Sequence, residues 1–492
     1  MTVMHVEARP GAYRDSVTLL EISRAVSNTE GVSDAIIAMG TPLNIDLMRE
    51  IGFILENPNP NDLIIAIRAV DEITIQTALA KLSSELVAID LRARTAGEGG
   101  QLAPPRSVGR THGTDLALIS VPGSGAFAEA MDALESGQSV MIFSDNVATW
   151  QEIALKDRAA SEGLLVMGPD CGTAVIGGVG LGFANVVAPG PVGIVAASGT
   201  GAQHVLSLLD IAGVGITHCI GVGGRDLSGE VAGRSTLSAL DALANDDRTK
   251  VIVLISKPAS PAVAQLIQER AALISKPVVF AFLGENAADL TAATETVLQT
   301  LSVSIPTWPS WGTTLSLKSG GPYLRGLYSG GTICDEAMVI AASQLGPIYS
   351  NIPLRPEWRL DPFKQSHEHS FIDFGDDAMT VGRAHPMIDS TLRIERFIKE
   401  LADPACGVII MDVVLGHGAD PDPARTLAPA IRDAVSQRKL PIVISLIGTS
   451  GDPQGLDRQA NQLSQAGAYV TVSNAEAIRT AIALIESSEH HA

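Results

Sequence analysis

Ser198-Gly199-Thr200-Gly201 combines residue types suited to holding an anion. It directly follows an apolar run that ends at Ala197 and directly precedes a helical pattern. Free backbone N–H groups at a helix start, with two hydroxyls and two glycines that allow close approach, favour a phosphate. The alternative is an ordinary N-cap followed by the glycines of a tight turn.

A second segment, Met167–Gly178, also follows an apolar run and carries Asp170, Cys171 and Thr173. At the carboxyl edge of a sheet these side chains could meet a ligand. Cys171 would need a lowered pKa and a nearby base to act as a nucleophile, and no base adjoins it in the sequence. The alternative is a buried, inert thiol in a turn.

The third segment, Ile220–Gly233, offers a glycine cradle and a cation. Gly223 and Gly224 after an apolar run suit a phosphate or a carboxylate, and Arg225 could clamp an anion with two hydrogen bonds. The pattern lacks the GxGxxG spacing of dinucleotide folds. The alternative is a glycine-rich turn with a solvated Arg225–Asp226 pair.

The fourth segment places Ser329–Thr332 before a helical pattern, with Asp335 and Glu336 expected in the first turn of that helix. Acidic residues there stabilise the helix dipole but oppose a bound phosphate. Capping therefore competes with anion binding in this segment.

Three further segments are less specific. Ile372–Ile388 is rich in acidic residues beside glycine, which could hold Mg²⁺ for a phosphorylated substrate or could be solvated turn residues. Gly416-His417-Gly418 and the segment Leu446–Pro453 lie at further strand–turn–helix junctions. The acidic segment Ile372–Ile388, the fifth of the candidate segments, contains Asp373, Asp376, Asp377, Arg383 and His385. His367 and His369 lack a third ligand for zinc, so we predict no protein-bound metal.

The elements that must position these segments repeat in a regular order: a short apolar run, a glycine-rich turn and a helical pattern. Most of the apolar runs are continuous, which indicates parallel strands covered on both faces. Repeated strand–helix units predict doubly wound α/β sheets with right-handed crossovers. The predicted strands are Asp34–Ala38, Leu63–Ile67, Leu116–Val121, Ser139–Phe143, Leu164–Met167, Gly193–Ala196, Ile216–Val222, Val251–Ile255, Val278–Phe282, Gly407–Asp412, Ile442–Leu446 and Tyr469–Val472. The predicted helices include Ala126–Leu134, Thr149–Ser161, Ala202–Ile211, Thr236–Leu243 and Pro421–Val435.

Three Pro/Gly-rich, non-periodic stretches mark boundaries between domains. They are Thr95–Arg110, Val187–Val192 and Ser302–Pro322. The predicted organisation is a small N-terminal α/β domain at 1–105, a domain at 106–189, a domain at 190–301, a linker at 302–321 and a domain at 322–492.

Composition excludes several classes of protein. The 492 residues carry a formal net charge of −20, which argues against a surface built for nucleic acid or anionic membranes. There is no 18-residue apolar run and no secretory signal, and the four cysteines lie far apart, so a reducing cytoplasmic setting is expected. Walker A, HExxH and GxSxG patterns are absent, which lowers support for several hydrolases and NTPases.

Short motifs along nearly the whole chain resemble the FdrA family, which is in turn similar to the succinyl-CoA synthetase superfamily. The resemblance implies a CoA-binding-type Rossmann domain at 106–189 and flavodoxin-like ligase domains at 190–301 and 322–492. The motifs are Arg14–Ser16, Met39–Pro42, Phe143–Val147, Met167–Thr173, Ala197–Thr200, Gly223–Leu227, Ser256–Pro258, Gly330–Thr332, Gly375–Asp377, Val381–Asp389 and Asp412–Val414.

The superfamily binds the phosphate of a phosphohistidine between two facing helix starts. The resemblance implies that Ser198–Gly201 begins one of these helices and Gly416–Gly418 the other. The phosphohistidine loop itself departs from the pattern, because Gly284–Gly331 contains no histidine. No ATP-grasp pattern is visible either, so a self-contained ATP-driven CoA ligase is not expected.

FdrA proteins resemble a subunit of a multi-subunit oxamate carbamoyltransferase, which interconverts oxalurate plus phosphate with oxamate plus carbamoyl phosphate. The leading hypothesis is therefore acyl or carbamoyl transfer through an acyl phosphate. Ser198–Gly201 and Gly416–Gly418 would bind phosphate, Arg225 would neutralise a substrate anion with Gly223 and Gly224 beside it, and Asp170, Cys171 and Thr173 would line the pocket.

The alternatives are a CoA-ligase-like subunit and a non-catalytic scaffold that binds CoA or a metabolite. The cofactor stays open between none, CoA and Mg²⁺. Expected partners are a small anionic substrate and other enzyme subunits, with neither nucleic acid nor membrane.

Overall fold

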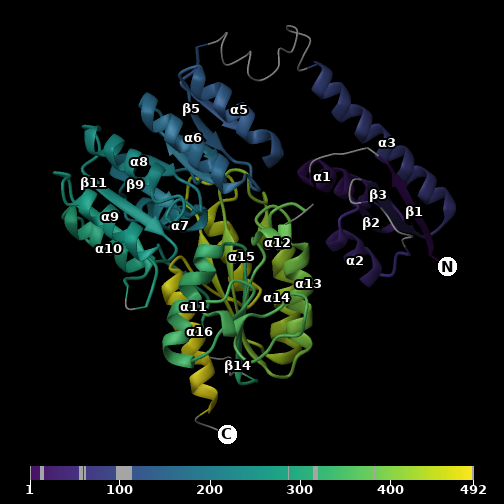
Figure 1. Ribbon diagram of the computed structural model, residues 1–492. Helices are drawn as coiled ribbons and strands as arrows, with labels where there is room; N and C mark the ends of the chain where they lie inside the picture. Colours follow the sequence, from purple (N-terminus) through teal and green to yellow (C-terminus); the bar gives the residue numbers. More distant parts are fainter. Residues whose placement is uncertain are drawn as a thin grey trace. The chain divides into compact units, whose positions relative to one another are not determined.

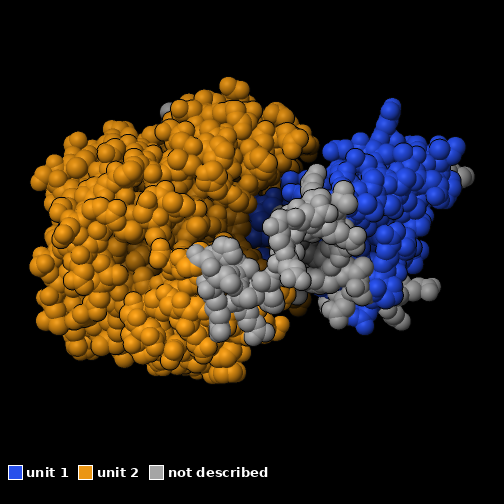
Figure 2. Space-filling view, turned by 90° about the horizontal axis from the view of Figure 1, so that it is seen from above, with its two compact units in different colours: residues 1–103, 375–389 blue, residues 104–374, 390–492 orange. Residues whose placement is uncertain are grey.

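The structure is a computed structural model that describes residues 2–10, 16–54, 59, 62–95, 113–285, 287–313, 320–380 and 383–489. It forms two compact units (Figure 2). Unit 1 contains residues 1–103 and 375–389, and unit 2 contains residues 104–374 and 390–492. Most of the predicted boundary Thr95–Arg110, and Arg14 and Asp15 of the first motif, lie outside the described residues.

Unit 1 is a small antiparallel sheet with helices on both faces (Figure 1). Strand β3 lies between the other two strands, in the order β1-β3-β2. Alternate β3 residues face opposite cores: Ile65 and Ile67 pack against α1 and α3, whereas Ile64 and Ala66 pack on the α2 side. The continuous apolar run thus correctly indicated burial on both faces, although these strands are antiparallel. The elements are β1 (Val3–Arg9), α1 (Ser16–Ser27), β2 (Val32–Met39), α2 (Pro42–Glu50), β3 (Leu63–Ala69) and α3 (Glu72–Thr95).

Residues 375–389 interrupt the sequence of unit 2 but belong to unit 1. It contains the short helix α12 (Asp377–Thr380). Arg383 Nε donates to Asn44 Oδ1 at 2.8 Å, and Arg24 Nη2 donates to the carbonyl of Ile388 at 3.4 Å. The fifth segment is therefore divided, because Asp373 stays in unit 2.

Unit 2 contains three sheets. The first is parallel, with the order β4-β5-β6. Its elements are β4 (Leu116–Ile119), α5 (Gly123–Glu135), β5 (Ser139–Ile142), α6 (Thr149–Glu162) and β6 (Val166–Met167).

The second sheet has the order β12-β11-β9-β10-β7-β8, with β9 to β12 parallel and the β7–β8 hairpin added antiparallel. The order of the parallel strands is that of a flavodoxin-like sheet. The elements are β7 (Thr173–Ile176), β8 (Val179–Gly182), β9 (Pro189–Ala197), α7 (Gly199–Ile211), β10 (Ile216–Gly221), α8 (Arg234–Asn245), β11 (Val251–Ser256), α9 (Pro261–Ala271), β12 (Val278–Phe282) and α10 (Leu290–Thr300).

The third sheet has the order β13-β19-β18-β17-β14-β16-β15, parallel except for β13. Strands β14, β16, β17, β18 and β19 again follow the flavodoxin-like order. The elements are β13 (Ser310–Trp311), β14 (Tyr323–Tyr328), α11 (Gly331–Leu345), β15 (Tyr349–Ser350), the 3₁₀ turn η1 (Pro356–Trp358), β16 (Ser370–Asp373), α13 (Thr391–Ala402), β17 (Cys406–Val414), α14 (Pro423–Arg438), β18 (Ile442–Ile447), α15 (Leu456–Gln465), β19 (Tyr469–Thr471) and α16 (Asn474–Glu489).

The doubly wound α/β prediction is confirmed, but two predicted boundaries do not separate sheets. Strands β7 and β8 precede residue 190 yet extend the second sheet. Strand β13 lies inside the predicted linker 302–321 and pairs with β19 at the edge of the third sheet.

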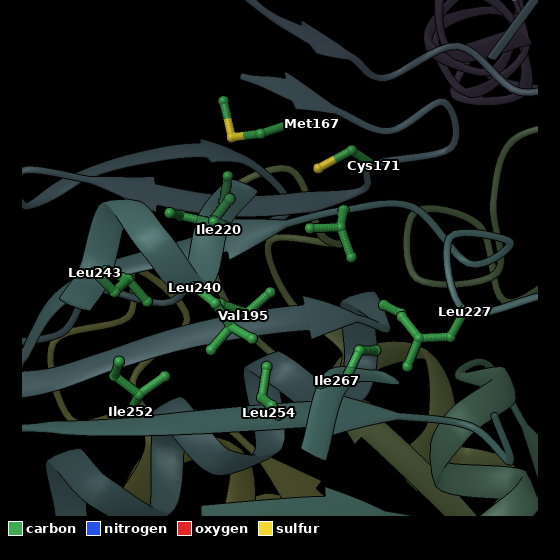
Figure 3. Packing of buried hydrophobic residues seen from close by; sticks show 14 of the residues in the cluster. Met167, Cys171, Val195, Ile220, Leu227, Leu240, Leu243, Ile252, Leu254 and Ile267 are labelled. Atoms are coloured by element: carbon green, nitrogen blue, oxygen red, sulfur yellow. The ribbon is translucent and has the colours of Figure 1, made fainter. Parts of the chain in front are cut away.

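One hydrophobic cluster joins the first two sheets across the predicted boundary near residue 189. Met167 of the first sheet belongs to the same buried cluster as Val195, Ile220 and Leu254 of the second (Figure 3). Met141 of the first sheet is also part of this cluster. These side chains are at most 4% exposed. The first two sheets therefore share one apolar cluster, while a separate cluster packs Ile119 and Ile142 of the first sheet against α5 and α6.

Candidate functional site

The topology of unit 2 creates two places where a ligand crevice is expected. In a flavodoxin-like sheet the crevice lies beyond the carboxyl ends of the strands at which the direction of winding reverses. In the second sheet these strands are β9 and β11, which lead into Ser198 and Lys257. In the third sheet they are β14 and β17, which lead into Ser329 and Leu415.

The helix start after β9 forms as predicted. Ser198 has extended backbone and is the N-cap of α7, and its Oγ accepts the N–H of Gly201 at 2.9 Å. The remaining N–H groups of the first turn have no partner within a helix, so they can serve an external acceptor. Ser198 and Thr200 are 9% exposed, so the start of α7 is largely shielded from solvent.

The start of α7 meets the start of α11, which follows β14. Ser198 Oγ donates to Thr332 Oγ1 at 2.7 Å. A Cβ at Gly330 would lie 2.7 Å from both Cγ2 and Oγ1 of Thr200, so only glycine fits at this approach. The α11 start has no side-chain cap. Two helix starts with their partial positive charges therefore face the same place.

This finding corrects the predicted second helix start. Gly416–Gly418 lie in a loop, and the next helix, α14, begins only at Pro423. The loop is still at the carboxyl edge next to α11, because β17 neighbours β14. Gln203 of α7 donates to the carbonyl of Leu415 at 3.4 Å, and exposed His417 forms a bridge with Ala184. The glycine loop therefore adjoins α7 without providing a helix start.

Lys257 is the cation that the two sheets bring to the facing helix starts. A Cβ at Gly331 would lie 2.9 Å from Lys257 Nζ and 2.7 Å from Asp373 Oδ2. Lys257 also pairs with Asp335 at 3.4 Å, and its side chain is 40% exposed. Burial alone would lower the pKa of Lys257, but Asp335 and Asp373 outweigh burial and raise it. The ammonium group is therefore charged and accessible at this edge.

The acidic residues of α11 are not in its first turn, contrary to prediction. The helix begins at Gly331, so Asp335 and Glu336 fall in the second turn. Glu336 accepts the N–H of Leu290 at the start of α10 and the amide of Asn474, both at 2.6 Å. Neither carboxylate occupies the N-terminal position that would exclude a phosphate.

Asp170, Cys171 and Thr173 were predicted to line the pocket, and the structure places their side chains in three different environments. Thr173 Oγ1 donates to the carbonyl of Phe183 at 2.8 Å and lies 3.5 Å from the Cβ position of Gly199. Cys171 lies in the core with Met167 (Figure 3), its thiol donates to carbonyl oxygens, and burial raises its pKa to about 12. The geometry therefore favours the inert-thiol interpretation of Cys171. Asp170 is exposed.

Arg225 is held by protein groups. Its Nη2 donates to the carbonyl of Val147 at 2.7 Å and pairs with Glu152 at 3.0 Å, while its side chain stays 46% exposed. Asp226 is fully buried and pairs with Lys156 at 2.7 Å, so the alternative of a solvated Arg225–Asp226 pair is wrong. The ion pairs Lys156–Asp226 and Arg225–Glu152 connect α6 to the loop after β10.

Close packing requires glycine at position 223 but not at 224. A Cβ at Gly223 would lie 2.3 Å from the carbonyl of Pro169, and its φ is +87°. A Cβ at Gly224 would lie 3.7 Å from the Asp170 carboxylate, so an acidic group already adjoins this turn.

The sequence did not identify Lys257 as a site residue, and it placed Thr332 in the fourth candidate segment without pairing that segment with Ser198. Lys257 lies in the motif Ser256–Pro258, but a single lysine after a strand has no local signature. The signal that could have identified both residues is their position after a strand at which the winding reverses. Recognising such a strand requires knowledge of the strand order.

The chain is 38% identical over 497 residues to the uncharacterized protein YahF of Escherichia coli, and the match covers 95% of each chain. The chain belongs to the YahF family. Residues 327–484 of this YahF-family chain match the family described as CoA-ligase, and residues 1–102 match the family described as AllF, heavy metal-associated domain. It is thus a member of the succinyl-CoA synthetase superfamily with an AllF-type N-terminal domain.

More distant relatives cover parts of the YahF-family chain. The succinate–CoA ligase [ADP-forming] subunit alpha of Methanothermobacter thermautotrophicus is 29% identical over 176 residues, which are 34% of this chain and 57% of that subunit. A dinucleotide-forming acetyl-coenzyme A synthetase of Ca. Korarchaeum cryptofilum is 17% identical, with a TM-score of 0.30, and the match covers 77% of this chain and 84% of that one.

The heavy-metal description does not fit the residues of the N-terminal domain. Residues 1–102 contain no cysteine and one histidine, His5, which lies 3.4 Å from Glu7. Soft metal ions prefer thiolate ligands, which this domain lacks. Across the described residues there is also no group of three or more His, Cys, Asp or Glu arranged to hold a metal ion. Among the described helices, none has the length and apolar character needed to cross a membrane.

Proposed function

We propose that this chain is an enzyme subunit that binds phosphate between the starts of α7 and α11 and transfers a carbamoyl or related acyl group through an acyl phosphate. The proposed reaction is oxalurate plus phosphate to oxamate plus carbamoyl phosphate. The observation that carries the proposal is the 2.7 Å contact between Ser198 and Thr332, which joins two helix starts in a chain without a histidine between residues 284 and 331. The AllF-type N-terminal domain supports the link to this chemistry.

The facing helix starts suit the charge changes of this reaction. An oxygen of hydrogen phosphate attacks the ureido carbonyl carbon of oxalurate, the C–N bond to the oxamate nitrogen breaks, and that nitrogen takes the proton that the phosphate loses. Both reactants are anions, and negative charge develops on the carbonyl oxygen during the attack. Backbone N–H groups of α7 and α11 would hold phosphate, and Lys257 would pair with the second anion. The loop 416–418 and Thr173 would border the pocket.

A CoA-ligase-like function is the second candidate, because residues 327–484 match the CoA-ligase family. CoA carries several phosphates, which usually require cationic side chains or helix starts. The loops after β4, β5 and β6 (120–124, 143–148 and 168–172) contain no lysine, arginine or histidine. They contain Asp145 and Asp170, both exposed. Arg225, which donates to the carbonyl of Val147, and the starts of α5 and α6 are the cationic side chain and the helix starts at this edge, and we derive no step through it.

The test is phosphorolysis of oxalurate by the full chain together with its partner subunits. We expect carbamoyl phosphate to form, and Ser198→Ala to reduce kcat/KM at least tenfold with a raised KM for phosphate. The matched control is Ser343→Ala, which changes an exposed serine on α11 and should leave the rate unchanged. Absence of carbamoyl phosphate with all subunits present contradicts the proposal. Micromolar CoA binding by calorimetry, lost on altering residues 168–172, would favour the ligase-like function instead.

A further inference from the structure

A buried carboxylate holds the start of α11. Asp412, in β17, accepts the backbone N–H of Ser329 at 2.7 Å and its hydroxyl at 2.8 Å through Oδ1. Its Oδ2 accepts the N–H of Gly330 at 2.9 Å. Asp412 therefore fixes the turn that connects β14 to α11, and it uses the two N–H groups that precede the helix. The first-turn N–H groups from Gly331 to Ile333 are left for an external acceptor, since the N–H of Cys334 donates to the carbonyl of Gly330.

A buried arginine neutralises this carboxylate. Arg393 Nη1 donates to Asp412 Oδ1 at 2.8 Å and to the Asp412 carbonyl at 2.7 Å. Asp412 is fully buried and Arg393 is 3% exposed, so water screens neither charge. A carboxylate at a helix start satisfies the same dipole that would attract a phosphate, and like charges repel strongly in a poorly screened site. Arg393 offsets that repulsion.

We infer that Asp412 and Arg393 are positioning residues for the phosphate site: Asp412 aims the first turn of α11 at Ser198, and Arg393 cancels the charge that Asp412 would otherwise direct at the bound anion. This inference rests on the proposed function. Neither residue touches the substrate, because both are enclosed behind the turn at Ser329–Gly330. Their effect on binding passes through the N–H groups of α11 and through the local charge.

The experiment compares Arg393→Met, Asp412→Asn and the double variant in the full chain. The dissociation constant for inorganic phosphate is measured by calorimetry, alongside KM, kcat and thermal stability. We expect R393M to weaken phosphate binding at least tenfold and the double variant to bind more tightly than R393M, because it removes the unpaired carboxylate. A structural role alone would make the double variant no better than R393M. R393K keeps the positive charge and should stay within about threefold of wild type, the scale of a minor perturbation.

Arg396→Met is the matched control. Arg396 is another buried arginine on α13, 6% exposed, but it pairs with Glu400 at 2.5 Å and not with Asp412. We expect this variant to retain wild-type phosphate affinity even if it is less stable.

The outcomes distinguish a failure of the proposed function from a failure of the positioning inference. Wild-type protein that does not bind phosphate, or whose binding is unaffected by Ser198→Ala, contradicts the proposed function. Binding that depends on Ser198 but is unchanged in R393M, or is weakened equally by R396M, overturns only the positioning inference. If R393M does not fold, a tenfold weakening in R393K also overturns it.

Discussion

Replacement of Gly330 by alanine tests the approach of the two helix starts most directly. The added Cβ would lie 2.7 Å from Cγ2 and Oγ1 of Thr200 and 2.8 Å from its Cβ. Ordinary carbon contacts are about 3.5–4.0 Å, so α7 and α11 must separate by about 1 Å. The φ of Gly330 is −115°, which alanine adopts without strain, so the contact alone is tested.

Overpacking of this kind costs about 1–3 kcal/mol of folding free energy. We therefore expect Gly330→Ala to lower the free energy of unfolding by that amount. A separation of about 1 Å also disturbs the shared anion site, and misplacement on this scale can cost about 100-fold in rate. Urea unfolding followed by circular dichroism measures the change in stability, and the rate of carbamoyl phosphate formation, together with phosphate calorimetry, measures the change at the site.

Two further variants complete this prediction. Gly284→Ala is the control, because no atom lies within 4 Å of the added Cβ, and it should be neutral or slightly stabilising. Thr200→Gly removes all three close atoms, so the double variant with Gly330→Ala should recover at least about 1 kcal/mol relative to the sum of the single changes. A Gly330→Ala protein as stable as the control, with no coupling to Thr200, would refute the proposed approach of the helices.

Three further predictions follow from buried groups. Burial raises the pKa of Glu336 from 4.5 to about 7, so the native state keeps a proton that the unfolded chain loses, and stability should fall by about 3 kcal/mol as pH rises from 4.5 to 7. Glu336→Gln should abolish that part of the slope in urea titrations across this range. Lys156 bridges Glu152 and Asp226 at 2.7 Å within the core, so Lys156→Met should destabilise unit 2 by about 3–5 kcal/mol in thermal unfolding, whereas Lys364→Met at an exposed pair should not. All four cysteines are buried with raised pKa values, so a thiol reagent at pH 8 should label none in the folded protein and four after denaturation.

The sequence predicted the elements with a simple apolar signal well. Each of the twelve predicted strands overlaps a strand in the structure, because a run such as Val251–Ile255 is fully buried and has no other stable location. The start of α7 was predicted from Ser198 and its glycines, and the structure confirms the cap. Both features depend on local residues alone.

Strand β14 was missed because its sequence includes an arginine in the middle. Arg325 is 1% exposed, which is tolerated only because it pairs with Glu400 at 3.0 Å and Asp403 at 2.9 Å. These partners lie at least 75 residues further along the chain. A buried charge needs such partners, and no local pattern announces them.

The pairing of helix starts was wrong for a related reason. Gly416–Gly418 and Ser329–Thr332 both follow strands and both contain glycines. Which of them begins a helix that meets α7 depends on the distance from the strand to the next helix and on strand order. The packing of Gly330 against Thr200 and the hydrogen bond from Ser198 to Thr332 identify the start of α11 as the one that meets α7.

The charges around the facing helix starts explain how an acidic protein could bind an anion. Lys257 and Arg393 supply two positive side chains near the start of α11, and Asp335, Asp373 and Asp412 supply three carboxylates. The formal sum of these side chains is 2 − 3 = −1, which agrees in sign with the −20 of the whole chain. Side-chain charge therefore does not favour an anion here. The attraction must come from the oriented N–H groups of two helices, which act at hydrogen-bonding distance and require the close approach that Gly330 permits.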